Sequence, residues 1–140
     1  MLNVDKIKDG IVIDHITPGC GYRIFQELEL AKLSYNVALL LNVSSQSSGT
    51  KDLIKIANVR NLDMTRLGLI DPNLTINIIE NEKIKEKLKL AIPEKVLGIM
   101  TCKNPRCISN NSDIGKIEFT LMDKDKKLYK CEYCDALTSY

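Results

Sequence analysis

The sequences TCKNPRC (residues 101–107) and KCEYCDA (residues 130–136) together hold four of the five cysteines in this chain of 140 residues. The first pair has four residues between its cysteines, the second pair has two, and 23 residues separate the pairs. The four residues are Cys102, Cys107, Cys131 and Cys134. Such spacings are typical of four thiolates around one tetrahedral Zn²⁺ ion, and the alternatives are two disulfides or coincidence.

The N-terminal sequence MLNVDKIKDG (residues 1–10) bears on the choice between these alternatives. It carries charge every few residues and lacks the apolar segment of a secretory signal, so we expect a cytoplasmic protein. Thiols stay reduced in that compartment, which favours metal over disulfides. We therefore predict one structural Zn²⁺ per chain. A catalytic zinc is not expected, because four cysteines fill its coordination shell. Cys20 is expected to be a small buried thiol.

Pro93 marks a predicted boundary between two domains, residues 1–92 and 93–140. The C-terminal segment is too small to bury a sufficient core unaided, since domains of this size generally need a metal or a disulfide. Metal binding would supply folding free energy there. The segment between the cysteine pairs needs only to leave one metal-binding turn and return to the other, so we expect a small antiparallel sheet.

The first 92 residues show the patterns of strands and helices in alternation. Strands are expected at residues 10–16, 36–43, 51–58, 74–80 and 83–90, and helices at residues 22–33 and 64–70. The apolar run at 36–43 is expected in the centre of a sheet. The predicted fold class is α+β: an N-terminal antiparallel sheet with two helices, of the ferredoxin-like sandwich type, followed by a small C-terminal all-β zinc domain.

Periodicity predicts which side chains share a face. In residues 10–16, one face holds Ile11, Ile13 and His15, and the other holds Val12, Asp14 and Ile16. In residues 51–58, Lys51 and Lys55 lie opposite Ile54 and Ile56. The helical face expected in residues 22–33 comprises Tyr22, Ile24, Phe25, Leu28 and Ala31.

Lys51, Lys55 and Lys87 stand on two of the predicted strands. Ammonium groups that converge from neighbouring strands can bind a polyphosphate. The alternative is that lysines on exposed strands only discourage association between sheets. The residues alone leave both possibilities open.

Composition excludes some classes of function. The net charge is only +2 and aromatic residues make up 5% of the chain, which argues against nucleic-acid binding, although a zinc-ribbon nucleic-acid binder remains the alternative reading. The sequence lacks an apolar run of the roughly 18–20 residues that cross a bilayer, so no membrane partner is expected. A hydrolase that uses Asp14 and His15 lacks an evident nucleophile.

Several short motifs, each weak alone, are together specific enough to indicate a protein family. GIVIDHI, KDLIKI, TINIIEN, IPEKV and the two cysteine pairs occur in this order, and the chain from Val4 to Leu137 resembles the regulatory chain of aspartate carbamoyltransferase. The resemblance implies a non-catalytic subunit of pyrimidine biosynthesis. Its N-terminal domain would bind ATP as activator and CTP with UTP as inhibitors. Its zinc domain would dock on the catalytic chain, and two regulatory chains would pair through their N-terminal domains.

The resemblance also implies the residues of the nucleotide site. They are Val4, Asp5, Lys6, Ile7, Asp14, His15, Lys51, Lys55, Asn77, Ile79, Ile84 and Lys87. In the family, the three lysines meet the base, ribose and triphosphate, and the backbone of residues 4–7 reads the base. Glu82 stands here where relatives have an aromatic residue, which bears on effector preference.

In the zinc domain, the resemblance implies contacts with the catalytic chain at Asn104, Arg106 and Asp135. Arg106 replaces a small amide residue and Asp135 replaces a glutamate, so the docking chemistry is expected to differ in detail.

Overall fold

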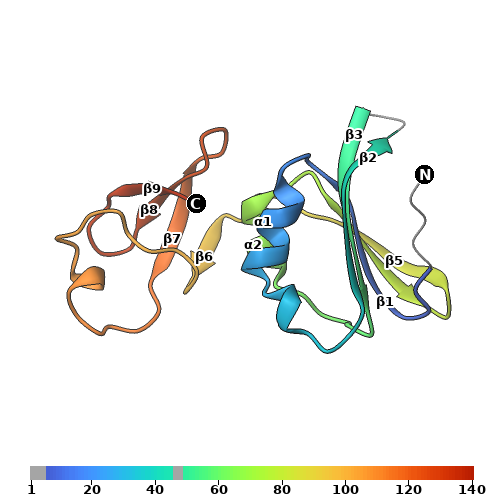
Figure 1. Cartoon of the computed structure of the whole chain (residues 1–140). Helices are drawn as coiled ribbons and strands as arrows, with labels where there is room; N and C mark the ends of the chain where they lie inside the picture. Colours follow the sequence, from blue (N-terminus) through green and yellow to red (C-terminus); the bar gives the residue numbers. More distant parts are fainter. Residues whose placement is uncertain (1–5, 46–48) are drawn as a thin grey trace. The chain divides into compact units, whose positions relative to one another are not determined.

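The computed structural model describes residues 6–45 and 49–140 of the chain (Figure 1). The chain divides into two compact units, Met1–Ala91 and Ile92–Tyr140. Each unit has an antiparallel sheet of its own. In the part of the chain that is described, no helix has both the length and the apolar character needed to cross a membrane.

The described residues of the first unit form a five-stranded antiparallel sheet in the order β2-β3-β1-β4-β5. Its strands are β1 (Gly10–Ile16), β2 (Val37–Ser45), β3 (Gly49–Ala57), β4 (Thr75–Glu80) and β5 (Lys83–Lys89). Helices α1 (Cys20–Glu27) and α2 (Met64–Ile70) cover one face of this sheet, and a short 3-10 helix, η1 (Leu30–Lys32), follows α1 (Figure 1). The order of the first four strands, with helices after β1 and β3, is that of a ferredoxin-like sandwich and confirms the predicted α+β class.

Isoleucines from the three central strands fill the layer between sheet and helices. The fully buried side chains of this layer are Ile11, Ile13, Ile54, Ile56 and Ile76 from the strands and Ile24 and Leu67 from the helices. Burial of one such side chain contributes about 1.5–3 kcal/mol. The predicted separation of Ile54 and Ile56 from the two lysines of the same strand is confirmed, because the lysines are only half-buried. The face of the sheet opposite the helices therefore carries the lysine side chains and is available to a polar ligand.

The prediction that His15 shares a face with Ile11 and Ile13 is wrong. The register of β1 against β3 shifts between Ile13 and Ile16, and His15 has a positive φ of 57°. A β-bulge of this kind inserts one residue and reverses the alternation after it. Ile16 is fully buried as a result, and His15 is exposed.

Two further predictions for this unit are wrong. The apolar strand at residues 36–43 is β2, which lies at the edge of the sheet and not in its centre, and its Leu41 is 51% exposed. The helix expected at residues 22–33 breaks at Glu29, whose φ is 53°, so its predicted apolar face does not continue. Leu30 is buried instead, whereas the side chains of Tyr22 and Ala31 are exposed.

Of the remaining local predictions for this unit, the helix cap and the last strand are confirmed, and the burial of Cys20 is wrong. Asp63 caps α2, since its carboxylate accepts a hydrogen bond from the backbone N–H of Arg66 at 3.1 Å. The lysine-rich segment at residues 83–90 is strand β5, and Asn81 and Glu82 form its two-residue hairpin turn with φ values of 52° and 66°. Cys20 is half-buried at the start of α1, so the expectation of a buried thiol is wrong.

The second unit is a four-stranded antiparallel sheet in the order β6-β7-β8-β9. Its elements are β6 (Lys95–Leu97), the 3-10 helix η2 (Ile108–Asn110), β7 (Glu118–Asp123), β8 (Leu128–Cys131) and β9 (Leu137–Ser139). Phe119 and Tyr129 are fully buried at its centre, and the Tyr129 hydroxyl donates a hydrogen bond to the carbonyl of Pro93 at 2.6 Å. The expectation of a small all-β unit around the cysteine pairs is confirmed.

Candidate functional site

The second unit brings its four cysteines together. Cys102 and Cys107 lie in the connection between β6 and β7, Cys131 ends β8, and Cys134 lies in the turn before β9. The four Sγ atoms lie within 4.8 Å of one another. The separations are 3.5 Å between Cys102 and Cys134 and 3.7 Å between Cys107 and Cys131. Zn–S bonds of about 2.3 Å place tetrahedral sulfur atoms about 3.8 Å apart, so the cluster fits one such ion.

The same distances are too long for disulfides, whose sulfur atoms lie about 2.05 Å apart. Each of the four thiols is free of a disulfide in the described chain. Burial raises the pKa of Cys102 to about 12, whereas hydrogen bonds from the hydroxyl and backbone of Ser109 lower the pKa of Cys107 to about 7. A divalent cation would override this difference, because a coordinating thiol is deprotonated outright.

Two consecutive asparagines hold the first cysteine loop in shape. The Asn110 side-chain amide donates to the carbonyl of Cys102 at 2.9 Å and to that of Asn104 at 2.8 Å. The Asn111 side-chain amide donates to the carbonyls of Pro105 at 2.9 Å and Cys107 at 2.8 Å. Sequence reasoning missed both residues. Their position just after the second cysteine, with side chains that donate two bonds each, is the signal that could have identified them.

The first unit presents its open sheet face as the second candidate site. Strand pairing places Lys55 opposite Val12, Val12 opposite Asn77, and Asn77 opposite Lys87. Residues directly opposite one another in antiparallel strands project to the same face, so these four side chains form one row across the sheet. Lys51 stands four residues before Lys55 on β3 and therefore projects to the same face.

One end of this face is hollowed by a cavity of about 740 Å³. Three of the residues that line it, His15, Lys51 and Lys87, belong to the predicted nucleotide site. The other lining residues are Ile16, Thr17, Pro18, Thr50, Pro72, Asn73, Leu74, Thr75, Lys89 and Leu90. The cavity is therefore basic and carries hydroxyl and amide groups, which suit an anionic ligand.

Asp14 lies beside this cavity and orients Lys51. Its Oδ1 meets the Lys51 ammonium at 2.8 Å and accepts the backbone N–H of His15 at 2.6 Å. Partial burial would raise the pKa of Asp14, but these two hydrogen bonds and the nearby positive charges hold that pKa below its ordinary value. Asp14 is thus ionised at neutral pH and fixes one of the cavity's cations.

A smaller cavity of about 430 Å³ contains the other predicted lysines of the site. Lys6, Ile7 and Lys55 line it, together with Lys8 and Asp9. The structure thus separates Lys55 from Lys51 and Lys87, which the resemblance treats as one set. Val4 and Asp5, also predicted for the site, lie outside the described residues.

Asn77 lies between the two cavities on the row that joins Lys55 to Lys87. It is only 7% exposed, and its Oδ1 has no hydrogen-bond partner among the described residues. An orphaned buried acceptor is costly unless a ligand or water completes it, so this atom suits a donor from a bound molecule. Ile79 and Ile84 pair across β4 and β5 one row further along, and Ile84 is 57% exposed.

Glu82, where relatives carry an aromatic residue, is exposed in the β4–β5 turn. Its backbone N–H donates to the carbonyl of Lys8 at 2.8 Å, so the turn lies against the N-terminal segment. The side chain of Asp9 accepts the backbone N–H of Asn81 at 3.1 Å and strengthens this contact. The unusual residue therefore lies near the smaller cavity, where Lys8 is also found.

Two buried carboxylates that sequence reasoning missed support the wall of the larger cavity. Asp52 is fully buried and accepts three backbone N–H groups at 3.0 Å, those of Gly19, Gly21 and Asn42. Asp71 accepts the backbone N–H of Thr17 at 2.7 Å. Asp52 projects to the same face of β3 as its buried isoleucines. A charged residue at a position where the alternation predicts a buried side chain is the signal that could have identified it.

The predicted contacts with the catalytic chain all lie on the cysteine loops. Asn104 is half-buried and its Oδ1 accepts the backbone N–H of Arg106 at 3.0 Å, which shapes the turn between the first two cysteines. Arg106 and Asp135 are exposed. Because the four Sγ atoms cluster, these two loops form one surface.

Comparison with known proteins gives both units the same family. Residues 2–91 match the allosteric domain of the aspartate carbamoyltransferase regulatory chain, and residues 94–140 match its metal binding domain. These matches give no support to the alternative of a nucleic-acid-binding zinc ribbon.

Individual relatives cover nearly the whole chain. An aspartate carbamoyltransferase regulatory chain from Clostridium tetani (strain Massachusetts / E88) is 55% identical over 138 residues, or 98% of this chain and 96% of the relative. One from Clostridium botulinum (strain Hall) is 48% identical over 139 residues, or 99% and 95%. One from Thermoplasma acidophilum is 40% identical over 138 residues, or 96% and 91%. The order of the motifs, the four-cysteine cluster and these matches agree, and the chain belongs to the family of aspartate carbamoyltransferase regulatory chains.

Proposed function

We propose that the first unit of this regulatory chain binds ATP, CTP and UTP and that the second unit transmits their effect to the catalytic chain of aspartate carbamoyltransferase. The observation that carries the proposal is the basic cavity lined by His15, Lys51 and Lys87, on the open sheet face of the unit that matches an allosteric domain. A polyphosphate is the ligand that such a set of cations suits best.

The nucleotide would extend along the open face. The row of Lys55, Val12, Asn77 and Lys87 joins the two cavities, and the unpartnered Oδ1 of Asn77 offers an acceptor midway. A nucleotide can shift the enzyme between forms of low and high affinity only by binding those forms unequally. In such systems the coupling free energy is typically about 1–3 kcal/mol.

The metal of the second unit is proposed to be one structural Zn²⁺. Four clustered thiols at tetrahedral spacing favour Zn²⁺ over hard cations, which prefer oxygen ligands. When bound, the ion supplies folding free energy to the unit and no open coordination position. Asn110 and Asn111 would hold the backbone of the first loop while the ion holds its sulfur atoms.

Pairing of two regulatory chains is proposed to use strand β2. This edge strand is apolar, with Leu41 51% exposed, and Tyr35 just before it is 48% exposed. The opposite edge strand, β5, carries four lysines, which discourage strand pairing. The two edges therefore differ in the way expected if only β2 continues into a partner sheet.

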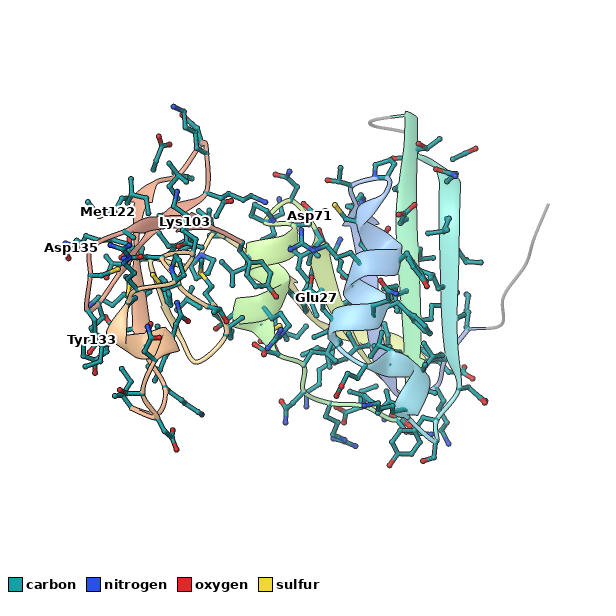
Figure 2. All side chains as sticks on the ribbon, turned by 60° about the vertical axis from the view of Figure 1, so that its left-hand side comes forward. Glu27, Asp71, Lys103, Met122, Tyr133 and Asp135 are labelled. Carbon is teal, nitrogen blue, oxygen red and sulfur yellow. The ribbon has the colours of Figure 1, made fainter. Side chains whose placement is uncertain are left out.

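Docking on the catalytic chain is proposed to use the cysteine loops and the apolar side chains around them. Large apolar residues that are at least about two-fifths exposed in this unit are Leu97, Ile108, Met122, Tyr133 and Leu137. Figure 2 shows Met122, Tyr133 and Asp135 along one edge of the unit in that view. Exposed aromatic and apolar anchors beside charged groups are typical of protein interfaces.

Calorimetric titration of the full chain with CTP and ATP tests the nucleotide proposal. Saturable heat is expected with both, because both carry the triphosphate that the cations attract. Lys51→Ala should weaken both ligands, whereas Lys127→Ala, in the β7–β8 hairpin of the second unit, should not. Folded wild-type chain that binds neither nucleotide would overturn the proposal.

A further inference from the structure

The connection between the two units is short, and a buried tyrosine holds its C-terminal end. We propose that the Tyr129 hydroxyl, bonded to the carbonyl of Pro93, acts as a clamp that confines the joint between the units to Leu90 and Ala91. The clamp itself follows from contacts within the second unit. Its consequence, that a change in strand β5 passes to the second unit through a stiff joint, rests on the proposed nucleotide function and deepens it.

On the side of the first unit, the joint begins where strand β5 ends. Lys89 is the last residue of β5 and still pairs with Thr75 of β4. Leu90 and Ala91 follow outside any helix or strand, and Ala91 is exposed. The division between the units falls directly after Ala91. These two residues therefore separate the sheet of the first unit from the start of the second unit.

The second unit fixes its own first residues through hydrogen bonds from two of its strands. The Tyr129 hydroxyl on β8 donates to the carbonyl of Pro93 at 2.6 Å. The Leu121 N–H on β7 donates to the carbonyl of Glu94 at 2.7 Å. Proline has no N–H, so its carbonyl is the one backbone group through which a hydrogen bond can hold Pro93. Proline also restricts the residue before it, Ile92, to extended conformations, which stiffens the start of the unit.

Tyr129 is suited to act as this clamp. Its side chain is fully buried, and its strand β8 lies between β7 and β9 in the sheet. Cys131 of the candidate metal site follows two residues later and is also buried, so both side chains project to the inner face of the sheet. Burial raises the pKa of Tyr129 to about 12, so the hydroxyl keeps its proton and remains a donor at neutral pH. The clamp is thus anchored in the core that the four cysteines adjoin.

Strand β6 alone would hold the start of the second unit weakly. It has three residues, Lys95–Leu97, and lies at the edge of the sheet beside β7. Segments at the end of a sheet open locally at a lower free-energy cost than its centre. Tyr129 adds a hydrogen bond from β8, the strand beyond β7, to a residue that precedes β6. Without this bond, the joint would extend further into the second unit.

A short joint between stiff ends transmits a displacement that a longer one would absorb. Flexible linkers behave as random coils and impose little orientation on the domains they connect. Strand β5 carries Lys87 of the predicted nucleotide site and runs directly into the joint. We therefore expect loss of the Tyr129 hydroxyl to reduce the response of the catalytic chain to nucleotide without weakening nucleotide binding.

The first test measures amide exchange in Tyr129→Phe, in the full chain loaded with Zn²⁺. Phenylalanine keeps the ring and removes only the hydroxyl. Loss of one hydrogen bond shifts an opening equilibrium about fivefold, so the amide of Leu121, whose acceptor is the Glu94 carbonyl, should exchange about fivefold faster. The amide of Cys131, which is bonded within the β8–β9 turn, should keep its wild-type rate. Tyr22→Phe, which removes an exposed hydroxyl from the first unit, should change neither rate.

Two results of this test would overturn the inference. One is an unchanged exchange rate at Leu121 in Tyr129→Phe. The other is equal acceleration at Leu121 and Cys131, because that would indicate a general loss of stability and not the release of a clamp.

The second test uses the complex reconstituted with its catalytic chain. The ratio of activities with and without ATP should lie closer to one in Tyr129→Phe than in the wild type, while calorimetry gives an unchanged dissociation constant for ATP. Insertion of Gly-Gly after Ala91 lengthens the joint directly and should have the same effect. A wild-type response in either variant would contradict the inference. A wild-type complex whose activity ATP does not alter would instead overturn the proposed function, and exchange at Leu121 would still decide whether the clamp exists.

Discussion

Asp52 and Asp63 show how differently two carboxylates can contribute to one fold. Asp63 caps α2 from an exposed position through the backbone N–H of Arg66. Asp52 is fully buried and is the acceptor for three backbone N–H groups, from the start of α1 and from β2. Gly21 leaves room for it, because a Cβ there would lie 2.8 Å from the Asp52 carboxylate. Asp52 therefore ties three segments together at one point.

Replacing the two carboxylates should give clearly different losses of stability. Asp52→Ala leaves the buried N–H of Gly21 and the part-buried N–H groups of Gly19 and Asn42 without their acceptor. An unpaired buried donor costs about 1–3 kcal/mol and each lost hydrogen bond about 1 kcal/mol, so we expect a loss of about 3 kcal/mol or more in the free energy of unfolding. Asp63→Ala removes one exposed cap and should cost about 1 kcal/mol. Urea titration of both variants at neutral pH measures the difference. Equal losses would show that Asp52 does not have the role assigned to it.

Individual site residues could be predicted from the sequence where their charge or spacing is unusual. Residues that act through the backbone or lie at an irregular turn could not. The four cysteines are evident from their spacing, and the structure clusters them as that spacing requires. The nucleotide residues remain a prediction, and the structure divides them between two cavities. The face of His15 is predicted wrongly, because the two-residue periodicity of a strand does not reveal a β-bulge. Asn110 and Asn111 act through backbone carbonyls, which the sequence pattern does not reveal.

Among the strands, the contrast between β2 and β5 matters most for assembly. The five-strand sheet of the described residues has an apolar edge at β2 and a lysine-rich edge at β5. An unprotected apolar edge offers both backbone hydrogen bonds and side-chain burial to a second strand. The position of β2 could not be read from its composition, because this edge strand is as apolar as a central strand would be.

A lysine on β2 should prevent pairing of two regulatory chains. Leu41→Lys places a charge on the edge proposed to pair, so the isolated chain should sediment as a monomer at concentrations where the wild type is a dimer. Ile84→Lys makes the same change on β5, where the exposure is similar at 57% against 51%, and should leave the wild-type mass unchanged. A dimer that persists in Leu41→Lys, or that is lost in Ile84→Lys, would mean that β2 is not the interface.

The elements themselves were largely predictable because their signals are local. Asp63 and Asp71-Pro72 bracket α2, and alternating lysines identify β5. The end of the first helix depends on tertiary packing, which local sequence signals do not reveal. The helix expected at residues 22–33 ends early, since Glu29 takes a positive φ and Leu30, rather than Ala31, turns into the core.

Across the whole chain, the two units differ in what stabilises them. The first buries a layer of isoleucines beneath two helices, whereas the second has a small core around Phe119 and Tyr129 beside four clustered thiols. We therefore expect that a single metal ion folds the second unit, while the first unit folds through its own core and binds nucleotide without the metal. The family match of each unit to a separate domain is consistent with that division.

The most direct test is to strip the metal from the full chain with a thiol-reactive mercurial, then remove the mercurial under reducing conditions with a chelator. Hydrogen exchange is followed residue by residue, and the released zinc is measured. We expect close to one Zn²⁺ per chain, loss of amide protection throughout residues 92–140, and protection of residues 6–45 and 49–91 that persists together with ATP binding. Readdition of Zn²⁺ should restore the second unit. Full protection of residues 92–140 in chain free of metal would contradict the claim.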